Sequence, residues 1–384
     1  MADRYILFVD DDTAQQDLFE TAVQDWNGKN AETGRCFHHE TAETVEQAEE
    51  LLKRKRFDAA LFDLRVRSEG QVAQSANPTG NRLALSAMRE RGVPVGIMTA
   101  DDSVLDEEVR NSGQVRVFDK NAPDNDIGNA YDQAIAWFAE LWGMLDVLDA
   151  ARSRIDGSAA DVFLRRIWPM WSNFAALEDG RDADLVDIVT RQYVSHIAEL
   201  LGLDGPDAVT WHPFEVYVNP SLLEDRSHTG DIFKFDEDLW VVLTPQCDMA
   251  TQKVPNAILA KCVRGIKDWK ENVEALKAAT SKTKKKEPTE FLRVFVNQNL
   301  GPAKHFLPPL PGEVEPLLVH FGDLRSMSME ELNQRLVARQ ASIAAPFLSN
   351  IVQRFGSYIS RMGQPDIDVE RFDQLAGPQE RRRG

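Results

Sequence analysis

The chain has 384 residues, of which 43% are hydrophobic and 28% are charged, with a formal net charge of −18. This length exceeds that of one ordinary hydrophobic core, so it predicts two domains or more. The acidic balance argues against a protein that coats nucleic acid, because phosphate backbones attract the opposite charge. The three cysteines, Cys36, Cys247 and Cys262, are few and odd in number, which is typical of a reducing compartment rather than of a disulfide framework.

The sequence shows neither a membrane segment nor a leader. No apolar run reaches the ~20 residues that a membrane helix needs. The start, MADRYILFVDDD, lacks the apolar core of a signal peptide. We therefore expect a cytoplasmic protein that has no membrane partner.

Short apolar runs alternate with amphipathic stretches up to about residue 125. We expect strands over 5–9, 36–39, 58–62, 95–99 and 115–118, with helices between them. Near-continuous apolar strands separated by helices are typical of a parallel sheet that is covered on both faces. The predicted fold class of this part is α/β, a flavodoxin-like doubly wound five-stranded parallel sheet whose sites lie at the carboxyl ends of its strands.

Beyond this sheet the apolar residues recur at spacings of three and four. Ile135, Phe138, Trp142, Leu145 and Leu148 predict a long final helix that packs on the sheet and on the next domain. The alternative is a signalling or dimer helix that extends beyond the first domain. We place the first domain at 1–155, a second at 156–370, and a disordered tail at 371–384.

The second half predicts an α+β domain, for which a small β-barrel is one interpretation. Residues 211–249 contain strand-like runs bounded by Gly, Pro or acidic residues, and a helical segment rich in Lys and Ala follows. The Lys-rich run 282–286 is interpreted as a solvated loop, with contact to nucleic acid or an acidic partner as the alternative. Further strands are expected at 291–296 and 317–321, and helices over 329–358.

Polar residues stand where four of the expected strands end. They are Asp10 and Asp11 after the first, Asp63 after the third, Thr99 after the fourth and Lys120 after the fifth. Clustered carboxylates repel one another, and a hard divalent cation such as Mg²⁺ relieves that cost. A metal-screened carboxylate is a nucleophile for phosphorus, and a lysine and a hydroxyl stabilise the phosphoryl oxygens. The pattern therefore predicts a phosphoryl-accepting magnesium site.

Four segments carry a family resemblance: ILFVDDD, AALFD, Thr99-Ala100 and the strand ending in FDK. Over about residues 4–145 the chain resembles the receiver domain (CheY-like) of two-component response regulators. The resemblance implies that Asp63 accepts a phosphoryl group from a histidine of a kinase or kinase-like ATPase.

The resemblance also implies a role for each neighbour of the acceptor. Asp10 and Asp11 match the acidic pair that holds Mg²⁺, together with Asp63 and the backbone carbonyl of Arg65. Thr99 and the lysine at position 120 match the residues that contact the phosphoryl group.

Three departures from the family pattern concern how phosphorylation is read out. Val117 stands where the family has an aromatic switch residue, and Asn121 and Ala122 separate the lysine from Pro123. The loop after Asp63, RVRSEGQVAQSANPTG, is long and polar where the family has a short turn. The alternative to a phosphoacceptor is therefore a pseudo-receiver, a scaffold that works without phosphorylation.

The second half contains no basic recognition helix and no glycine-rich nucleotide signature. Its best catalytic candidate is Cys247-Asp248, with a base drawn from the histidines, although a packed structural cysteine is the more frequent case. The segment GDIF…WVVLTPQCDM is similar to a module of uncharacterised bacterial proteins in which it is fused to a receiver-like domain. Such proteins sit beside histidine-kinase-like ATPases, some of them in suspected anti-phage loci.

Three functions remain open at this point. The first is a response regulator of a phosphorelay that signals through a non-DNA-binding second domain, as a monomer or a homodimer. The second is a receiver-controlled effector enzyme, a cysteine hydrolase or nuclease. The third is the phosphorylation-independent scaffold.

Overall fold

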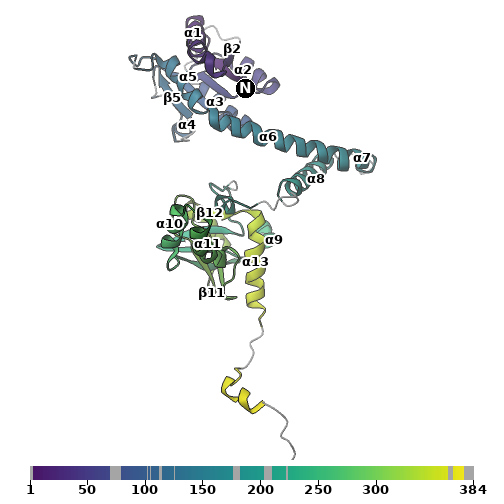
Figure 1. Ribbon diagram of the computed structural model, residues 1–384. Helices are drawn as coiled ribbons and strands as arrows, with labels where there is room; N and C mark the ends of the chain where they lie inside the picture. The colour runs from purple at the N-terminus through teal and green to yellow at the C-terminus, as the bar shows by residue number, and fades with distance from the viewer. Residues whose placement is uncertain are drawn as a thin grey trace, which may run out of the picture. The chain divides into compact units, whose positions relative to one another are not determined.

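The computed structural model describes residues 3–69, 79–101, 103, 105–111, 115–124, 126–175, 182–202, 210–221, 224–361 and 366–375. The chain divides into two compact units, Met1–Asp207 and Ala208–Gly384 (Figure 1). The boundary predicted between 155 and 156 falls inside a continuous helix, α6 (Trp142–Val162). Of the tail expected at 371–384, the first residues lie in a 3₁₀ helix (Val369–Leu375), and the rest is outside the described residues.

Unit 1 is built on a parallel sheet, which confirms the predicted α/β fold class. Its five strands are β1 (Arg4–Val9), β2 (Phe37–Ala42), β3 (Ala59–Asp63), β4 (Val95–Thr99) and β5 (Val115–Asp119). They lie in the order β2-β1-β3-β4-β5, and every neighbouring pair is parallel. This is the flavodoxin-like order, in which β2 is added on one side of β1 and β3, β4 and β5 are added on the other side.

Helices cover both faces of this sheet. They are α1 (Thr13–Asn30), α2 (Val45–Arg54), α3 (Thr79–Arg91), α4 (Glu107–Asn111) and α5 (Ala130–Glu140). Successive strand residues point to opposite faces. Ile6 and Phe8 therefore pack with α1 and α5, whereas Leu7 and Val9 pack with α2, α3 and α4.

The long helix expected over 125–155 is two helices, α5 and α6, which are separated at Leu141. The α6 helix continues through a π-helical turn (Phe163–Ile167) into α7 (Trp168–Ala175), and α8 (Asp182–Gly202) returns beside α6 (Figure 1). The π turn ends two residues before Pro169, whose missing N–H cannot donate a regular helical hydrogen bond back into the turn. We call α6, the π turn, α7 and α8 the helical hairpin.

A buried arginine joins α6 to the amino end of β1. The Arg4 side chain is 1% exposed, and its Nη1 donates to Asp58 Oδ1 at 3.0 Å. The same guanidinium forms ion pairs with Asp146 and Asp149 of α6. It also lies 5.7 Å from the centroid of the Trp142 ring. The first turns of α6 are therefore held against the parallel sheet by charge as well as by apolar packing.

Unit 2 is α+β, as predicted, and its sheet is antiparallel throughout. The strands are β6 (Tyr217–Val218), β7 (Asp231–Phe235), β8 (Asp238–Val242), β9 (Asn256–Arg264), β10 (Lys304–Leu307), β11 (Leu317–Ser328) and β12 (Arg339–Ile343). Their order is β10-β11-β9-β8-β7-β12-β6. Because β10 and β6 do not pair with each other, the described strands form a curled half-barrel, which is the small barrel predicted above without its closure.

Five helices accompany this sheet, and a short 3₁₀ helix (Pro213–Val216) precedes β6. They are α9 (Gln246–Thr251), α10 (Trp269–Ala278), α11 (Lys282–Val296), α12 (Met329–Gln334) and α13 (Ala345–Ile359). Val241 of the central strand β8 packs on the face that α13 covers, and Val242 packs on the face with α9 and α12. No described helix of either unit is long and apolar enough to cross a membrane.

Four expectations for unit 2 were wrong. The segment interpreted as helix after Met249 contains β9, and the helical region 329–358 contains β12. The Lys-rich run and the strand expected at 291–296 both belong to α11. That helix begins because the Ser281 hydroxyl accepts a hydrogen bond from the Lys284 N–H, a cap that a loop interpretation overlooks.

Candidate metal centre and active site

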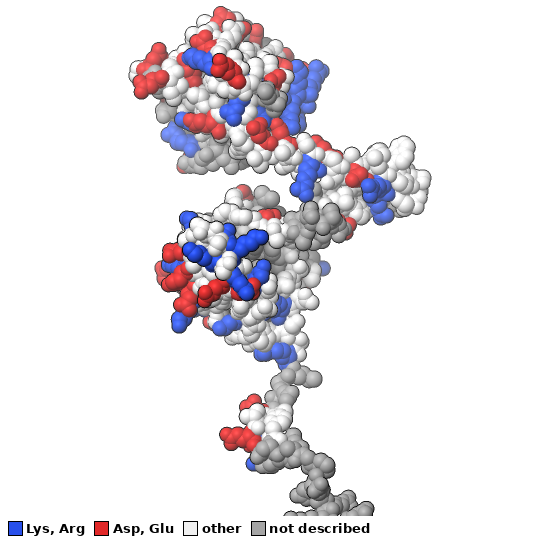
Figure 2. Space-filling view, in the orientation of Figure 1, with Lys and Arg blue, Asp and Glu red and all other residues white. Residues whose placement is uncertain are grey.

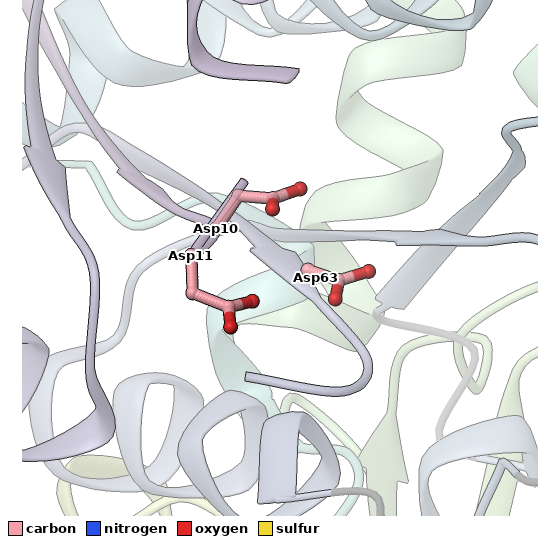
Figure 3. A group of neighbouring side chains, drawn as sticks. All are labelled: Asp10, Asp11 and Asp63. Atoms are coloured by element: carbon pink, nitrogen blue, oxygen red, sulfur yellow. The ribbon is translucent and has the colours of Figure 1, made fainter. Parts of the chain in front are cut away.

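Three carboxylates converge at the carboxyl end of the parallel sheet. Asp10 and Asp11 follow β1 and Asp63 ends β3, and their ligand oxygens all lie within 4.8 Å of one another (Figure 3). The sheet register explains this meeting, because Val9 pairs with Phe62 and the next residues of both strands therefore stand side by side. The Asp10 side chain is 2% exposed and that of Asp63 is 14% exposed.

Lys120 reaches the same place from the end of β5. Its Nζ lies 2.8 Å from Asp10 Oδ2 and 2.9 Å from Asp63 Oδ1. Its backbone N–H donates to the carbonyl oxygen of Thr99 at 2.8 Å, which aligns the ends of β4 and β5. One ammonium therefore bridges two of the three carboxylates.

Burial and charge act in opposite directions on these groups. Burial raises the pKa of Asp10, and the nearby ammonium of Lys120 offsets that effect only in part. Burial alone would lower the pKa of Lys120, but the charges of Asp63 and Asp10 outweigh it and raise the pKa. The lysine is therefore protonated at neutral pH. With all three aspartates ionised, the cluster and Lys120 together carry two negative charges.

The three carboxylates fit a Mg²⁺ ion by their chemistry. Magnesium prefers a few carboxylates supplemented by waters and phosphate oxygens. Asp10, Asp11 and Asp63 supply hard oxygen donors from two adjacent strands, with the excess negative charge that a divalent ion neutralises. The Arg65 N–H donates to Asp63 Oδ2 at 3.2 Å, and the expectation that the Arg65 carbonyl completes the ligand set stays a prediction.

The hydroxyl of Thr99 takes part in a local turn at the end of β4. Its Oγ1 donates to the Asp101 carbonyl oxygen at 2.9 Å and accepts from the Asp101 N–H at 3.0 Å. Thr99 is buried and lies at the carboxyl end of the sheet, where the acidic cluster also lies. Its predicted contact with a phosphoryl group requires the hydroxyl to exchange at least one of these hydrogen bonds.

The aromatic residue of β5 lies in the core. Val117 is 38% exposed, whereas Phe118 is 6% exposed and packs 5.9 Å from the Trp137 ring. A Cβ at Gly96 would lie 3.1 Å from Phe118 Cε2 and 2.7 Å from Leu61 Cδ1, so the glycine makes room for this packing. The family's aromatic switch position is therefore occupied by valine, and the neighbouring ring is held on the inner face.

Sequence reasoning missed several residues around the cluster. The Tyr131 hydroxyl donates to Gln15 Oε1 at 2.6 Å. Burial, together with Asp10 and Asp63, raises the pKa of Tyr131. Arg67 lies 3.8 Å from Asp11, in the described start of the long loop. Residues 70–78 of that loop are outside the described residues. Nothing in the local sequence pattern marks these contacts, because each joins segments far apart in the chain.

The cysteine candidate of unit 2 has no histidine base hydrogen-bonded to it among the residues that the structure describes. Cys247 lies in α9, is exposed, and its Sγ contacts Asp248 Oδ1 at 3.9 Å. None of the described histidines is hydrogen-bonded to it. Cys262 is buried, and burial raises the pKa of its thiol to about 12. Burial favours a structural role for Cys262, whereas Cys247 is an exposed thiol without a hydrogen-bonded histidine among the described residues.

The Lys-rich run lies at the exposed start of α11. Lys and Arg side chains gather over α10 and α11, with Asp and Glu side chains directly beside them (Figure 2). The first acidic residue of α11 is Glu287, which directly follows the run. Since both signs of charge share this face, it does not have the one-sign character of a phosphate-binding surface.

Comparisons with known proteins reach only part of the chain. No protein-family model matches it, and no curated protein matches it. It is similar to the solved receiver domain of the sensor histidine kinase PA1611 from Pseudomonas aeruginosa PAO1, described with a magnesium ion in its active-site cleft. That likeness has 21% identity and a TM-score of 0.23, and covers 38% of this chain and 95% of that one.

Two further solved structures are similar. The chemotaxis response regulator CheY4 of Vibrio cholerae is 16% identical with a TM-score of 0.26, over 36% of this chain and 99% of that one. Full-length FixJ from B. japonicum is 18% identical with a TM-score of 0.28, over 52% of this chain and 88% of that one.

Proposed function

We propose that unit 1 is the phosphoacceptor domain of a response regulator and that Asp63 carries the phosphoryl group. The observation that supports this best is the meeting of Asp10, Asp63 and Lys120, with Nζ–O distances of 2.8 and 2.9 Å. A buried carboxylate pair bridged by one lysine is costly for the fold. Its position at the carboxyl end of a doubly wound sheet is where such folds bind ligands.

The proposed reaction transfers a phosphoryl group from a phosphohistidine to a carboxylate. A carboxylate oxygen of Asp63 attacks phosphorus, the phosphorus–nitrogen bond of the donor breaks, and the released imidazole takes up a proton. Lys120 stays protonated and stabilises the phosphoryl oxygens from within the site. A Mg²⁺ ion bound by Asp10, Asp11 and Asp63 supplies further charge neutralisation.

Intact-mass spectrometry after incubation with acetyl phosphate and Mg²⁺ tests this proposal. Wild type is expected to gain one phosphoryl group, and Asp63→Asn none. Asp12→Asn is the matched control, because Asp12 caps α1 and asparagine caps equally well. That variant removes a neighbouring carboxylate and is expected to be phosphorylated like wild type. Phosphorylation of Asp63→Asn, or none in wild type, contradicts the assignment.

The proposed donor is a histidine kinase or a histidine-kinase-like ATPase, and the proposed output is signalling through unit 2 without DNA binding. A role in bacterial defence against phage is the finer proposal. It predicts that phage protection by the native locus is lost when Asp63→Asn replaces wild type. Protection that persists with this variant assigns the chain to the scaffold alternative instead.

That scaffold is the second candidate, and one observation favours it. The Thr99 hydroxyl is held by Asp101, and Phe118 is fixed in the core, so neither is poised as a moving switch. Hydrogen exchange with and without beryllofluoride separates the two functions. A switching receiver changes protection in β4 and β5, whereas a scaffold that binds beryllofluoride without switching leaves both unchanged.

A homodimer is also proposed, through the helical hairpin. Its apolar side chains Leu164, Trp168 and Trp171 are 62%, 67% and 49% exposed. Sedimentation velocity on wild type and on Trp168→Glu is the test. A dimer that the substitution dissociates supports this surface, and a wild-type monomer at all concentrations excludes it.

A further inference from the structure

Unit 2 contains a cavity of about 710 Å³ between α13, β10 and the chain that leads into β6. This volume lies in the range of small-molecule sites, which are about 300–1,000 Å³. Most of its lining is apolar, with a few polar side chains that include His305 and Arg354. None of the residues that line it belongs to the acidic cluster of unit 1.

Two polar atoms among the lining residues lack protein partners. His305 is 4% exposed, yet its Nδ1 makes no hydrogen bond within the described structure, and neither does the buried Nε of Arg354. Buried polar atoms are nearly always hydrogen-bonded, because an unsatisfied one costs about 1–3 kcal/mol. The unpaired atoms of His305 and Arg354 stand in a mostly apolar lining, and they mark their part of the cavity as the place for a polar ligand group.

The charge at this end of the cavity is positive. Arg354 donates from Nη2 to the Lys304 carbonyl at 2.9 Å, but no carboxylate lies within 4.0 Å of it among the described residues. Burial and the charge of Arg354 lower the pKa of His305 to about 3, so this imidazole is neutral at physiological pH. A neutral imidazole with its proton on Nδ1 and a guanidinium N–H are two donors suited to one oxyanion.

The rest of the cavity lining is mostly aromatic and aliphatic. Trp211 and Phe347 meet edge to face, with ring centroids 5.5 Å apart, and both line the cavity. Phe306 lies in the opposite strand β10. Its backbone N–H and C=O are both hydrogen-bonded to the Gln298 side chain, at 2.8 and 2.9 Å. This part of the wall is therefore pre-formed.

We propose that this cavity binds a small organic anion, with its carboxylate, sulfonate or phosphate group at His305 and Arg354. Its aromatic or otherwise flat apolar body lies against Trp211 and Phe347. The proposal is independent of phosphorylation in unit 1, and unit 2 would then be a ligand-binding module.

Two fluorescent probes of similar shape test the proposal on the full chain. The first, 8-anilino-1-naphthalenesulfonate, carries an anionic group, and the second, N-phenyl-1-naphthylamine, has none. Arg354→Gln is expected to weaken sulfonate binding about tenfold, equivalent to ~1.4 kcal/mol, and to change amine binding less than twofold. Arg361→Gln is the matched control, since this exposed arginine just beyond α13 contacts Tyr358 and not the cavity.

Trp211→Ala is expected to weaken both probes, and Arg354→Lys, which keeps the charge but not Nε, to weaken the sulfonate partially. Circular dichroism melting shows that each variant is folded. Equal sulfonate affinity in wild type and Arg354→Gln overturns the proposal, as does unchanged binding of both probes by Trp211→Ala. Displacement of the sulfonate by indole-3-acetate assigns an aromatic carboxylate, and displacement by AMP assigns a nucleotide phosphate. Displacement by neither at millimolar concentration contradicts a physiological site.

Discussion

The Nζ of Lys120 lies 2.8 Å from Oδ2 of Asp10, and even so the pKa of this buried carboxyl is raised. The ion pair therefore does not recover the whole cost of removing the Asp10 charge from water. A divalent cation held by Asp10, Asp11 and Asp63 would lower the remaining cost. The uncompensated cost of the Asp10 charge determines how substitutions of Asp10 and Lys120 are expected to act.

Asp10→Asn is expected to stabilise the metal-free protein at neutral pH. The folded-state pKa of Asp10 is raised, so its contribution to stability is present at low pH and is lost as the pH rises through that value. Removing the ionisable group should raise the melting temperature by about 2–4 °C, or ~1 kcal/mol, at pH 7. Thermal melts at pH 7 and below pH 4 check this, because the difference should disappear in acid. A lower melting temperature at pH 7 contradicts the stated electrostatics.

Lys120→Met is expected to make the protein bind Mg²⁺ more tightly. The ammonium neutralises the same carboxylates that a metal would, so its loss leaves them facing one another. The metal-free variant should lose about 1–3 kcal/mol of stability. Its Mg²⁺ affinity should increase about tenfold, while phosphorylation by acetyl phosphate decreases. Isothermal titration with Mg²⁺ measures this, with the exposed Lys53→Met as control. An unchanged affinity would show that Lys120 and the metal do not compete.

Local patterns predicted much of unit 1 and less of unit 2. The central strands β1 and β3 are buried on both faces over most of their length, so residues 5–9 and 59–62 read as unbroken apolar runs that lead into aspartate. In unit 2, the composition of β9 hides the strand, because it contains residue types that favour helices, which are Ala257, Ala260, Lys261 and Arg264. Pro288 made a helix at 282–296 look unfavourable, yet α11 begins at the Ser281 cap and continues through this proline.

Of the residues at the candidate sites, some could be predicted from the sequence and others could not. Its acidic residues and lysine stand at strand ends, where the topology of a doubly wound sheet brings them together. Tyr131, Gln15 and the Arg354 cavity depend on tertiary packing that no spacing of residues encodes.

Arg4→Met is expected to loosen the first turns of α6. The substitution keeps the apolar volume but leaves Asp58, Asp146 and Asp149 without their shared cation. Because two of these acids are partly exposed, the expected loss is about 2 kcal/mol, less than for a fully buried pair. Hydrogen exchange should increase over residues 142–150. Arg35→Met is the matched control, since Arg35 also lies over the Trp142 ring, 5.2 Å from its centroid. Equal exchange in both variants would assign the docking of α6 to apolar packing.

The three thiols are expected to react with a disulfide reagent at three different rates. Exposed Cys247 reacts first, and Cys36 follows because burial and Asp3 raise its pKa. Buried Cys262, with a pKa of about 12, reacts only when unit 2 unfolds. Time-resolved Ellman titration measures these rates. The Cys247→Ala variant should lose the fast phase of wild type and keep the two slower ones. Alkylation of Cys247 should leave phosphorylation and phage protection intact, and loss of protection would favour the cysteine enzyme.

Strand β1 begins with Arg4 and is followed directly by Asp10, so one six-residue strand lies between the attachment of α6 and the acidic cluster. The ladders to β2 and β3 fix the position of this strand along its whole length. It is therefore a spacer of set length between two charged ends. Inserting one residue between Ile6 and Phe8 would turn their side chains to opposite faces of the sheet, so that keeping Arg4 in register would displace Asp10, and the reverse.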